Sequence, residues 1–199
     1  MSAVASEHAD DVDRQARFPA EAVQAMRDAS LLSAIIPTEF GGDGSNMREL
    51  AAITTAIALG CSSAGMVYAM HVSQVACLVR HAQGDRFFAS YLSELADRQL
   101  LLASVTSEVG VSGDTRSSVC ALERHDQTLR LVKDATTVSY GANADDIVMT
   151  CRRDADAPAG DQLLILCRQG SYSLAQKGSW DTMGMRGTCS PPYLVTAEG

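Results

Sequence analysis

LLLASVTSEVGVSGDTRSS, residues 100–118, marks the point at which the sequence changes character. The stretch begins with apolar and small residues and continues with Thr, Ser, Gly and Asp, which offer hydrogen bonds but almost no bulk. It has too little apolar surface for a core segment and more donors than a plain linker needs. Two hypotheses follow: a Gly/Ser surface loop, or a loop that binds an anion through its backbone amides and hydroxyls.

Before residue 100 the apolar residues recur with the spacing of amphipathic helices. One helix is predicted to begin at Pro19, which suits the first position of a helix, and a second to follow Ser45. A third is predicted from Ser62 or Ser63, and Asp85 can cap a short fourth. The predicted buried faces consist of Val23, Met26 and Leu31, then Met47, Leu50, Ile53 and Ile57, then Val67, Met70, Val75 and Leu78, and finally Phe87, Phe88, Tyr91, Leu92 and Leu95.

After residue 100 the pattern becomes that of short β-strands separated by turn residues. The predicted strands lie within residues 118–125, 128–134, 145–153, 162–169, 172–177 and 192–198. Residues 154–160, DADAPAG, are predicted to form a hairpin tip. The sequence therefore predicts an α+β fold: an N-terminal all-α helical domain, residues 1–99, followed by an antiparallel β-barrel or sandwich, residues 100–199. This order argues against a Rossmann fold, in which strands and helices alternate.

Composition excludes several function classes and narrows the predicted location. The chain has 199 residues, a formal net charge of −8 and no long basic run, which argues against nucleic-acid binding. Its six cysteines include no CxxC pair, and no histidine or acidic cluster has metal-ligand spacing, so no metal site is predicted. No apolar run approaches the ~20 residues of a membrane span. The N-terminus lacks the features of a signal peptide, and the thiols suit a reducing cytoplasm, the predicted location.

Four motifs occur in the order seen in the acyl-CoA dehydrogenase superfamily, which the chain resembles from about Phe18 to its end. They are LLSAIIPTEFGGDG (31–44), ASVTSEVGVSGD (103–114), LVKDATTVSYGANADDIVMT (131–150) and WDTMGMRGTCSPP (180–192). The resemblance implies a helical domain, a middle β-domain and a C-terminal four-helix bundle. It also implies FAD as cofactor, oxidation of the Cα–Cβ bond of an acyl-CoA thioester in fatty acid metabolism, and an electron-transfer flavoprotein as electron acceptor.

The resemblance assigns cofactor contacts to the loop that opens the second half. Val105 and Thr106 match positions whose backbone and hydroxyl meet the pyrimidine side of the isoalloxazine ring. Reduced flavin carries negative charge there, which amide and hydroxyl donors stabilise. Ser112 matches a serine near the FAD pyrophosphate and is also assigned to substrate binding. The loop departs from the family in lacking the proline of Thr-Glu-Pro, because Thr106 is followed by Ser107 and Glu108.

The resemblance assigns further cofactor contacts to the segment that follows Lys133. The family usually has Lys-x-Trp-Ile-Thr, in which the tryptophan packs on the flavin ring and the threonine hydroxyl bonds flavin N5. Aligned on Lys133, the tryptophan position is Ala135 and the threonine position is Thr137. Losing the aromatic ring removes stacking area, as in divergent, monooxygenase-like members of the family.

Substrate contacts are expected in the helical half. By resemblance, Met70 and His71 border the acyl channel, whereas a histidine in an apolar helical stretch also fits a core position with its ring nitrogens hydrogen-bonded. Arg186, in the last of the four motifs, is expected to act structurally rather than as a ligand group.

No catalytic residue is assigned, because the family's proton-abstracting carboxylate comes from the C-terminal part. The chain ends at Gly199, so the bundle is expected to be absent and the isolated chain to be a poor dehydrogenase. A second subunit or a homo-oligomer would supply what is missing. Two alternatives remain: a flavin-dependent monooxygenase-like or nitroalkane-oxidising relative, and a non-catalytic binding or assembly module.

Overall fold

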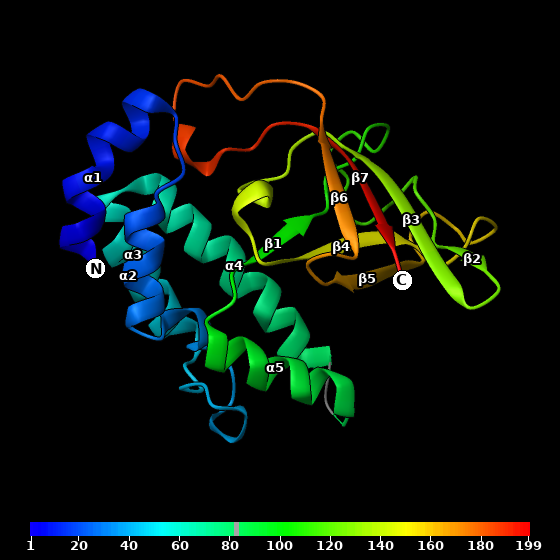
Figure 1. The fold of residues 1–199 in the computed structure, drawn as a ribbon, viewed down its shortest axis with the longest axis horizontal. Coiled ribbons are helices and arrows are strands. Elements are labelled where there is room, and N and C mark those ends of the chain that lie inside the picture. The colour runs from blue at the N-terminus through cyan, green and yellow to red at the C-terminus, as the bar shows by residue number, and fades with distance from the viewer. Residues whose placement is uncertain (82–83) are drawn as a thin grey trace. The chain divides into compact units, whose positions relative to one another are not determined.

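The computed structural model describes residues 1–81 and 84–199, which divide into two compact units (Figure 1). The first comprises Met1–Leu102 and Asp181–Cys189, and the second comprises Ala103–Trp180 and Ser190–Gly199. The predicted α+β class is confirmed, since helices fill the first unit and antiparallel pairs dominate the second. The short segment Asp181–Cys189 returns from the β-rich half of the sequence to the helical unit.

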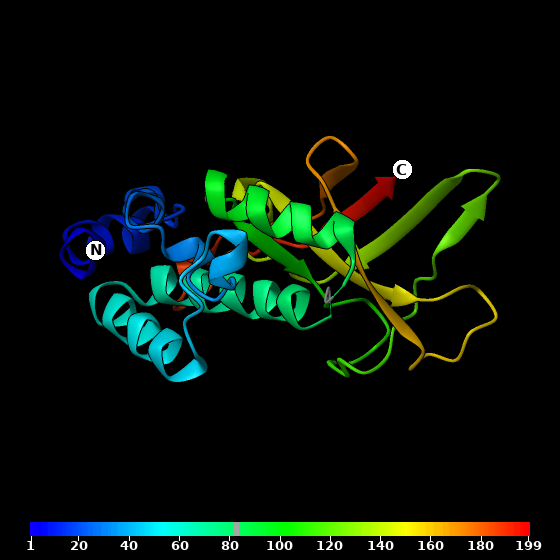
Figure 2. The same cartoon turned by 90° about the horizontal axis from the view of Figure 1, so that it is seen from below.

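Helices build the first unit, in which α3 packs on α4 and α1 packs on both α2 and α3 (Figure 2). The described helices are α1 (Ser2–Gln15), α2 (Ala20–Asp28), α3 (Met47–Gly60), α4 (Ser62–His81) and α5 (Arg86–Arg98), with 3-10 turns η1 (Leu31–Ser33), η2 (Thr38–Phe40) and η4 (Arg186–Thr188). Side-chain caps begin two of them. Asn46 forms a capping box with Glu49 at α3, and the predicted cap Asp85 accepts hydrogen bonds from Phe87 and Phe88 at α5.

The helical half departs from its prediction at several positions. Helix α1 was not predicted, because its buried side chains are the small Ala5 and Val12 and give only a weak apolar pattern. Pro19 precedes the first residue of α2 instead of being that residue. The predicted face of α3 is wrong at Met47, which is 67% exposed. The face of α5 is wrong at Phe87, which is 57% exposed. Both side chains lie in the first turn of a helix, ahead of the residues that pack.

Two sheets form the second unit. The three-stranded sheet has the order β1-β4-β5 and the four-stranded sheet the order β2-β3-β7-β6, so no closed barrel forms among the described strands and the sandwich alternative fits. The strands are β1 (Leu102–Val105), β2 (Glu123–His125), β3 (Thr128–Ala135), β4 (Asp146–Arg152), β5 (Gln162–Cys167), β6 (Tyr172–Gln176) and β7 (Tyr193–Glu198), with a 3-10 turn η3 (Gly141–Asn143).

The register of β3 decides which of its side chains are buried. It pairs antiparallel with β7, with Leu131 opposite Ala197 and Ala135 opposite Tyr193. Leu131, Lys133 and Ala135 therefore share one face, and all three are buried.

The predicted hairpin tip is confirmed, because β4 and β5 pair antiparallel on either side of residues 153–161. In the part of the chain that the structure describes, no helix combines the length and apolar character of a membrane span.

Candidate functional site

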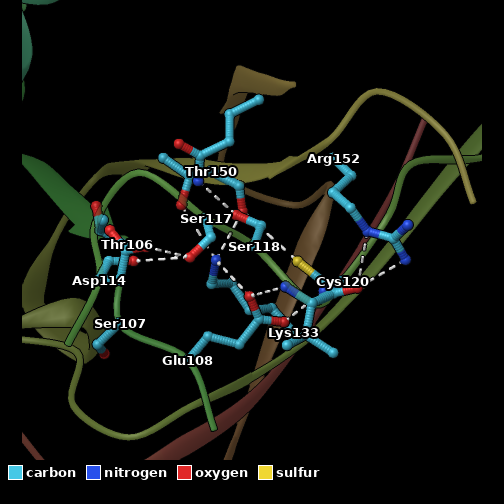
Figure 3. Close-up of polar contacts among 12 residues, drawn as sticks. Thr106, Ser107, Glu108, Asp114, Ser117, Ser118, Cys120, Lys133, Thr150 and Arg152 are labelled. Carbon is cyan, nitrogen blue, oxygen red and sulfur yellow. Dashed lines mark hydrogen bonds and ion pairs between the residues drawn. The ribbon is translucent and has the colours of Figure 1, made fainter. Parts of the chain in front are cut away.

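Glu108 closes the loop that follows β1. Its side chain is buried, and its two carboxylate oxygens accept hydrogen bonds from the backbone N–H groups of Val119, at 2.9 Å, and Cys120, at 2.6 Å (Figure 3). Residues 109–118 are thus held together at their base by one carboxylate. A carboxylate is well suited to this role, because it can accept several hydrogen bonds at once.

Lys133 of β3 faces the same carboxylate. Its Nζ lies 3.3 Å from Glu108 Oε2, and the two side chains are 0% and 4% exposed. Lys133 also donates hydrogen bonds to the carbonyl oxygen of Thr150, at 2.7 Å, and to its hydroxyl, at 3.1 Å (Figure 3). Burial beside this pair raises the pKa of the Cys120 thiol to about 12, while the charge of Lys133 acts in the opposite direction. The buried charges are therefore paired and hydrogen-bonded, as their burial requires.

Ser107 joins the loop to the end of β3. Its Oγ donates to the carbonyl oxygen of Thr137 at 2.6 Å and accepts from the Thr137 N–H at 3.0 Å. The Thr137 hydroxyl donates to Ser107 Oγ at 3.3 Å. A backbone hydrogen bond from Val109 to Asp134, at 2.9 Å, adds a second link. Thr137 itself is exposed, so its hydroxyl is held at the surface by a neighbour to which the sequence motifs assigned no role.

Val105, Thr106 and Ala135 differ in what they can offer a ligand. The side chains of Val105 and Ala135 are fully buried, so each is limited to its backbone groups. Thr106 is half-buried, and its hydroxyl lies 2.8 Å from that of Ser104. The site therefore keeps the hydroxyls of Thr106 and Thr137 but has a small, inward-facing residue where a large ring is usual in the resembled family.

The loop tip offers backbone donors. Gly110, Ser112 and Gly113 have positive φ angles of 100°, 50° and 81°. Within the residues that the structure describes, the backbone N–H groups of residues 110–113 take part in no hydrogen bond. Asp114 ends the tip, where backbone and hydroxyl donors from Arg116 and Ser117 hold the pKa of its carboxyl below the usual value. Such a run of amides is chemically suited to an anion such as a phosphate.

His71 and Met70 lie on α4 in the first unit. His71 is fully buried: Nε2 donates to the Leu32 carbonyl at 2.7 Å, and Nδ1 accepts from the Leu102 N–H at 3.0 Å. The tautomer is inferred from these two partners. Leu32 in turn donates its N–H to Gln99 Oε1 at 3.0 Å. Both ring nitrogens are therefore engaged by the backbone, and Met70 is half-buried beside it. Their predicted contact with substrate stays a prediction.

Arg186 holds its own segment to α1. Its Nε donates to the Asp13 carbonyl at 2.8 Å, and its Nη1 lies 3.3 Å from Asp181 Oδ1. Next to it, Gly187 packs so closely on Val12 that a Cβ would have no room. These contacts use the guanidinium within the unit, in agreement with the structural role predicted for it.

Glu108, Lys133 and Ser107 are the site residues that sequence reasoning did not assign. Lys133 served only to align a motif, and Ser107 and Glu108 were named only where the loop departs from the family. One signal was available: Lys133 occupies an inward position in the alternation of β3, between Leu131 and Ala135, where a charge requires a buried partner. Nothing in the sequence identified Glu108 as that partner.

Residues 1–97 match the family model described as acyl-CoA dehydrogenase, N-terminal domain. The chain is 23% identical over 187 residues to the putative acyl-CoA dehydrogenase YdbM of Bacillus subtilis (strain 168). The aligned region covers 92% of this chain and 48% of that protein. It is 25% identical over 167 residues to the probable FMNH2-dependent monooxygenase SfnC of Pseudomonas putida, covering 83% of this chain and 40% of that protein.

Among solved structures, the crystal structure of FMN-bound TdsC from Paenibacillus sp. A11-2 has the same fold. The TM-score is 0.79 at 22% identity, covering 98% of this chain and 51% of that one. The chain spans about half the length of the proteins it matches. At this identity the likeness to TdsC shows the fold, and the chemistry must be argued from residues.

Proposed function

We propose that this chain, which belongs to the acyl-CoA dehydrogenase superfamily, forms part of a flavin site in an oxidoreductase that acts on acyl-CoA thioesters. The superfamily expected from the sequence is confirmed, and its relatives make an oxidoreductase the general class of activity. The observation that carries the proposal is the loop 106–118. Hydroxyls of Thr106 and Thr137 lie at its base, and its tip bears backbone N–H groups suited to a phosphate.

Each part of the loop is proposed to contact a different part of the flavin. A bound flavin supplies two-electron redox chemistry at its N5 atom. Thr106 and the backbone of Val105 would donate toward the pyrimidine edge of the ring, where negative charge gathers on reduction. Thr137 would donate toward N5, held by Ser107. The amides of residues 110–113 and the Ser112 hydroxyl would hold the phosphate groups.

FAD is the proposed cofactor, because Ser112 corresponds to the family serine near the pyrophosphate. Met70 is proposed to border the acyl chain, with the buried His71 next to it on α4. An electron-transfer flavoprotein as acceptor, and a second subunit or a homo-oligomer, are proposed on the resemblance. Six free cysteines support a reducing compartment such as the cytoplasm.

A second candidate function is a flavin-dependent monooxygenase that uses FMN. Ala135 favours it, because this residue replaces the aromatic platform usual in the dehydrogenases and its side chain is fully buried. The similarity to a probable FMNH2-dependent monooxygenase and to an FMN-bound structure points the same way.

Flavin titration tests the proposal. The purified chain is titrated with FAD and with FMN, and bound flavin is measured by its visible absorption after gel filtration. We expect saturable binding, tighter for FAD, and weaker binding after Ser112→Ala, which removes the hydroxyl proposed to hold the phosphate groups. Arg130→Ala, an exposed change on β3, is the matched control. No uptake of either flavin by the chain would overturn the proposal.

Anaerobic reduction separates the two candidate functions. Flavin-loaded protein, together with the proposed second subunit, is mixed with a panel of acyl-CoA thioesters without oxygen. Bleaching of the flavin band is expected for a dehydrogenase. Preferential FMN binding without bleaching by any thioester would instead favour the monooxygenase.

A further inference from the structure

We propose that Glu108 and Lys133 act as a positioning pair for the flavin, holding the ring-contacting and phosphate-contacting parts of the loop in register. The inference rests on the proposed flavin site and adds two residues to it. Neither side chain would touch the cofactor, because both are buried.

The pair fixes the main chain at both ends of the loop. Glu108 follows Ser107 directly, and its carboxylate binds the N–H groups of Val119 and Cys120 on the far side. The proposed phosphate-binding tip, residues 110–113, lies between these two anchor points. A change in the position of the Glu108 carboxylate would therefore move the tip relative to Thr106.

Lys133 ties the same carboxylate to the sheets. It lies on β3, two residues before Ala135, and donates to both the carbonyl and the hydroxyl of Thr150 on β4. Thr137, the proposed N5 contact, follows on the same segment and is held by Ser107. The loop base and the end of β3 are thus connected three times, through Ser107, through the backbone hydrogen bond from Val109 to Asp134, and through the Glu108–Lys133 pair.

The energetic cost of the pair argues for a role beyond stability. Burying two opposite charges costs desolvation free energy that their attraction often fails to offset, and well-packed apolar residues can replace such pairs without loss of stability. Here every oxygen of Glu108 and several donors of Lys133 have defined partners. That directional network fixes positions in a way that apolar contacts do not, which is what an ordered ligand site requires.

The test is a charge-neutral double variant, Glu108→Gln with Lys133→Met, measured as the flavin-loaded chain. Because its net charge is unchanged, any effect on bound flavin reports position and not the overall field. We expect the Kd for FAD to rise about tenfold or more, and the preference for reduced over oxidised flavin to fall about fivefold, seen as a more negative midpoint potential. Lys133→Arg, which keeps the charge and the donors, is expected to retain most of both properties.

The matched control is Arg130→Met with Glu198→Gln. This pair, at 3.2 Å, joins the same strand β3 to β7 but is exposed, so its loss should leave flavin affinity and potential unchanged. If the buried double variant does not fold, Glu108→Asp replaces it, since this change keeps the charge but withdraws the carboxylate by one methylene. It is expected to shift both quantities in the same direction.

The outcomes separate the two proposals. If the wild-type chain takes up no flavin, the flavin site is refuted and the positioning pair with it. If the wild-type chain binds flavin and the folded double variant binds it with the same Kd and potential, the pair is structural only and this inference is wrong while the flavin site stands. A less stable variant with unchanged flavin properties likewise refutes the positioning role.

Discussion

Each unit contains a buried polar cluster, and the two clusters differ in kind. In the first unit, His71 and Gln99 use neutral groups to hold the backbone of Leu32. In the second, Glu108 and Lys133 use full charges. Both clusters satisfy buried polar groups, as native proteins generally do. The neutral cluster holds helical segments together, whereas the charged cluster ends in a loop with exposed donors.

This contrast indicates where to look for function in such a fold. A neutral cluster such as that of His71 is fully explained by the backbone groups it satisfies. A charged pair carries a desolvation cost that packing alone does not require. We therefore interpret the first cluster as part of the fold and the second as part of the site. Variants in each cluster test this difference.

Breaking the charged pair on one side should give the largest loss of stability. Glu108→Gln leaves the Lys133 ammonium buried without its carboxylate, and we expect the free energy of unfolding to fall by about 3–5 kcal/mol. Adding Lys133→Met should recover part of this loss. Urea denaturation of the two single variants and the double variant measures the coupling. Additive losses would contradict a direct interaction.

Removing the neutral cluster should cost less. His71→Phe leaves the Leu32 carbonyl and the Leu102 N–H without these partners, and each neutral group left unpaired in a buried place costs about 1–2 kcal/mol. The expected total is about 2–4 kcal/mol, measured by thermal or urea unfolding. His125→Asn, an exposed change in β2, is the control. Equal stability of His71→Phe and wild type would show that His71 is not the core residue described above.

The Ser107–Thr137 contact should contribute still less to stability but report directly on the site. Ser107→Ala removes the three hydrogen bonds between Ser107 Oγ and Thr137 at a partly exposed position, at an expected net cost of about 1 kcal/mol. Hydrogen exchange of the Thr137 amide should become faster in the flavin-free chain. Unchanged exchange at Thr137, with normal folding, would mean that Ser107 does not hold it.

At neutral pH the thiols next to the charged cluster should change the free energy of unfolding least, because they are protonated in both the folded and the unfolded chain. Burial disfavours the thiolate and raises the pKa of Cys120 to about 12 and of Cys151 to about 11. Because the folded pKa values lie above the ordinary value of 9.0, the stability they contribute is present below pH 9 and is lost as the pH rises toward 11–12.

Alkylation followed by peptide mass mapping measures this response. In the folded chain both thiols should react slowly at pH 8 and faster as the pH increases, while in urea they should react readily at pH 8. Fast alkylation of folded Cys120 at pH 8 would contradict its burial beside the charged pair.

Much of the fold could be predicted from the sequence, because most helices and strands follow from the local spacing of apolar residues. Periodicity indicated α3, α4 and α5, and Asp85 was correctly identified as a cap. The alternation of apolar residues indicated β3 and β7. Helix α1 was not predicted because Ala5 and Val12 bury little apolar area and give only a weak apolar pattern. The helix is held mainly by its neighbours. Met47 shows the opposite error, an apolar residue that the fold leaves exposed.

Only those site residues that belong to local sequence motifs could be predicted. The resemblance pointed to Thr106, Ser112 and Thr137, and the structure brings Thr137 to the base of that loop through Ser107. The pairing of Glu108 with Lys133 joins residues distant in sequence, and only the packing of β3 against the loop brings them together. A charged side chain is unfavourable at a buried position unless it has a partner. For Glu108 and Lys133, only the folded structure shows that each is the partner of the other.

The most direct test of the flavin site is amide NMR of the isotope-labelled chain during titration with FAD. Saturable shifts of the amides of residues 105–113 and of Thr137 are expected, with little change at His125 on β2. Binding that shifts other amides while residues 110–113 and Thr137 stay unchanged, or no binding at all, would contradict the assignment of this loop to a flavin.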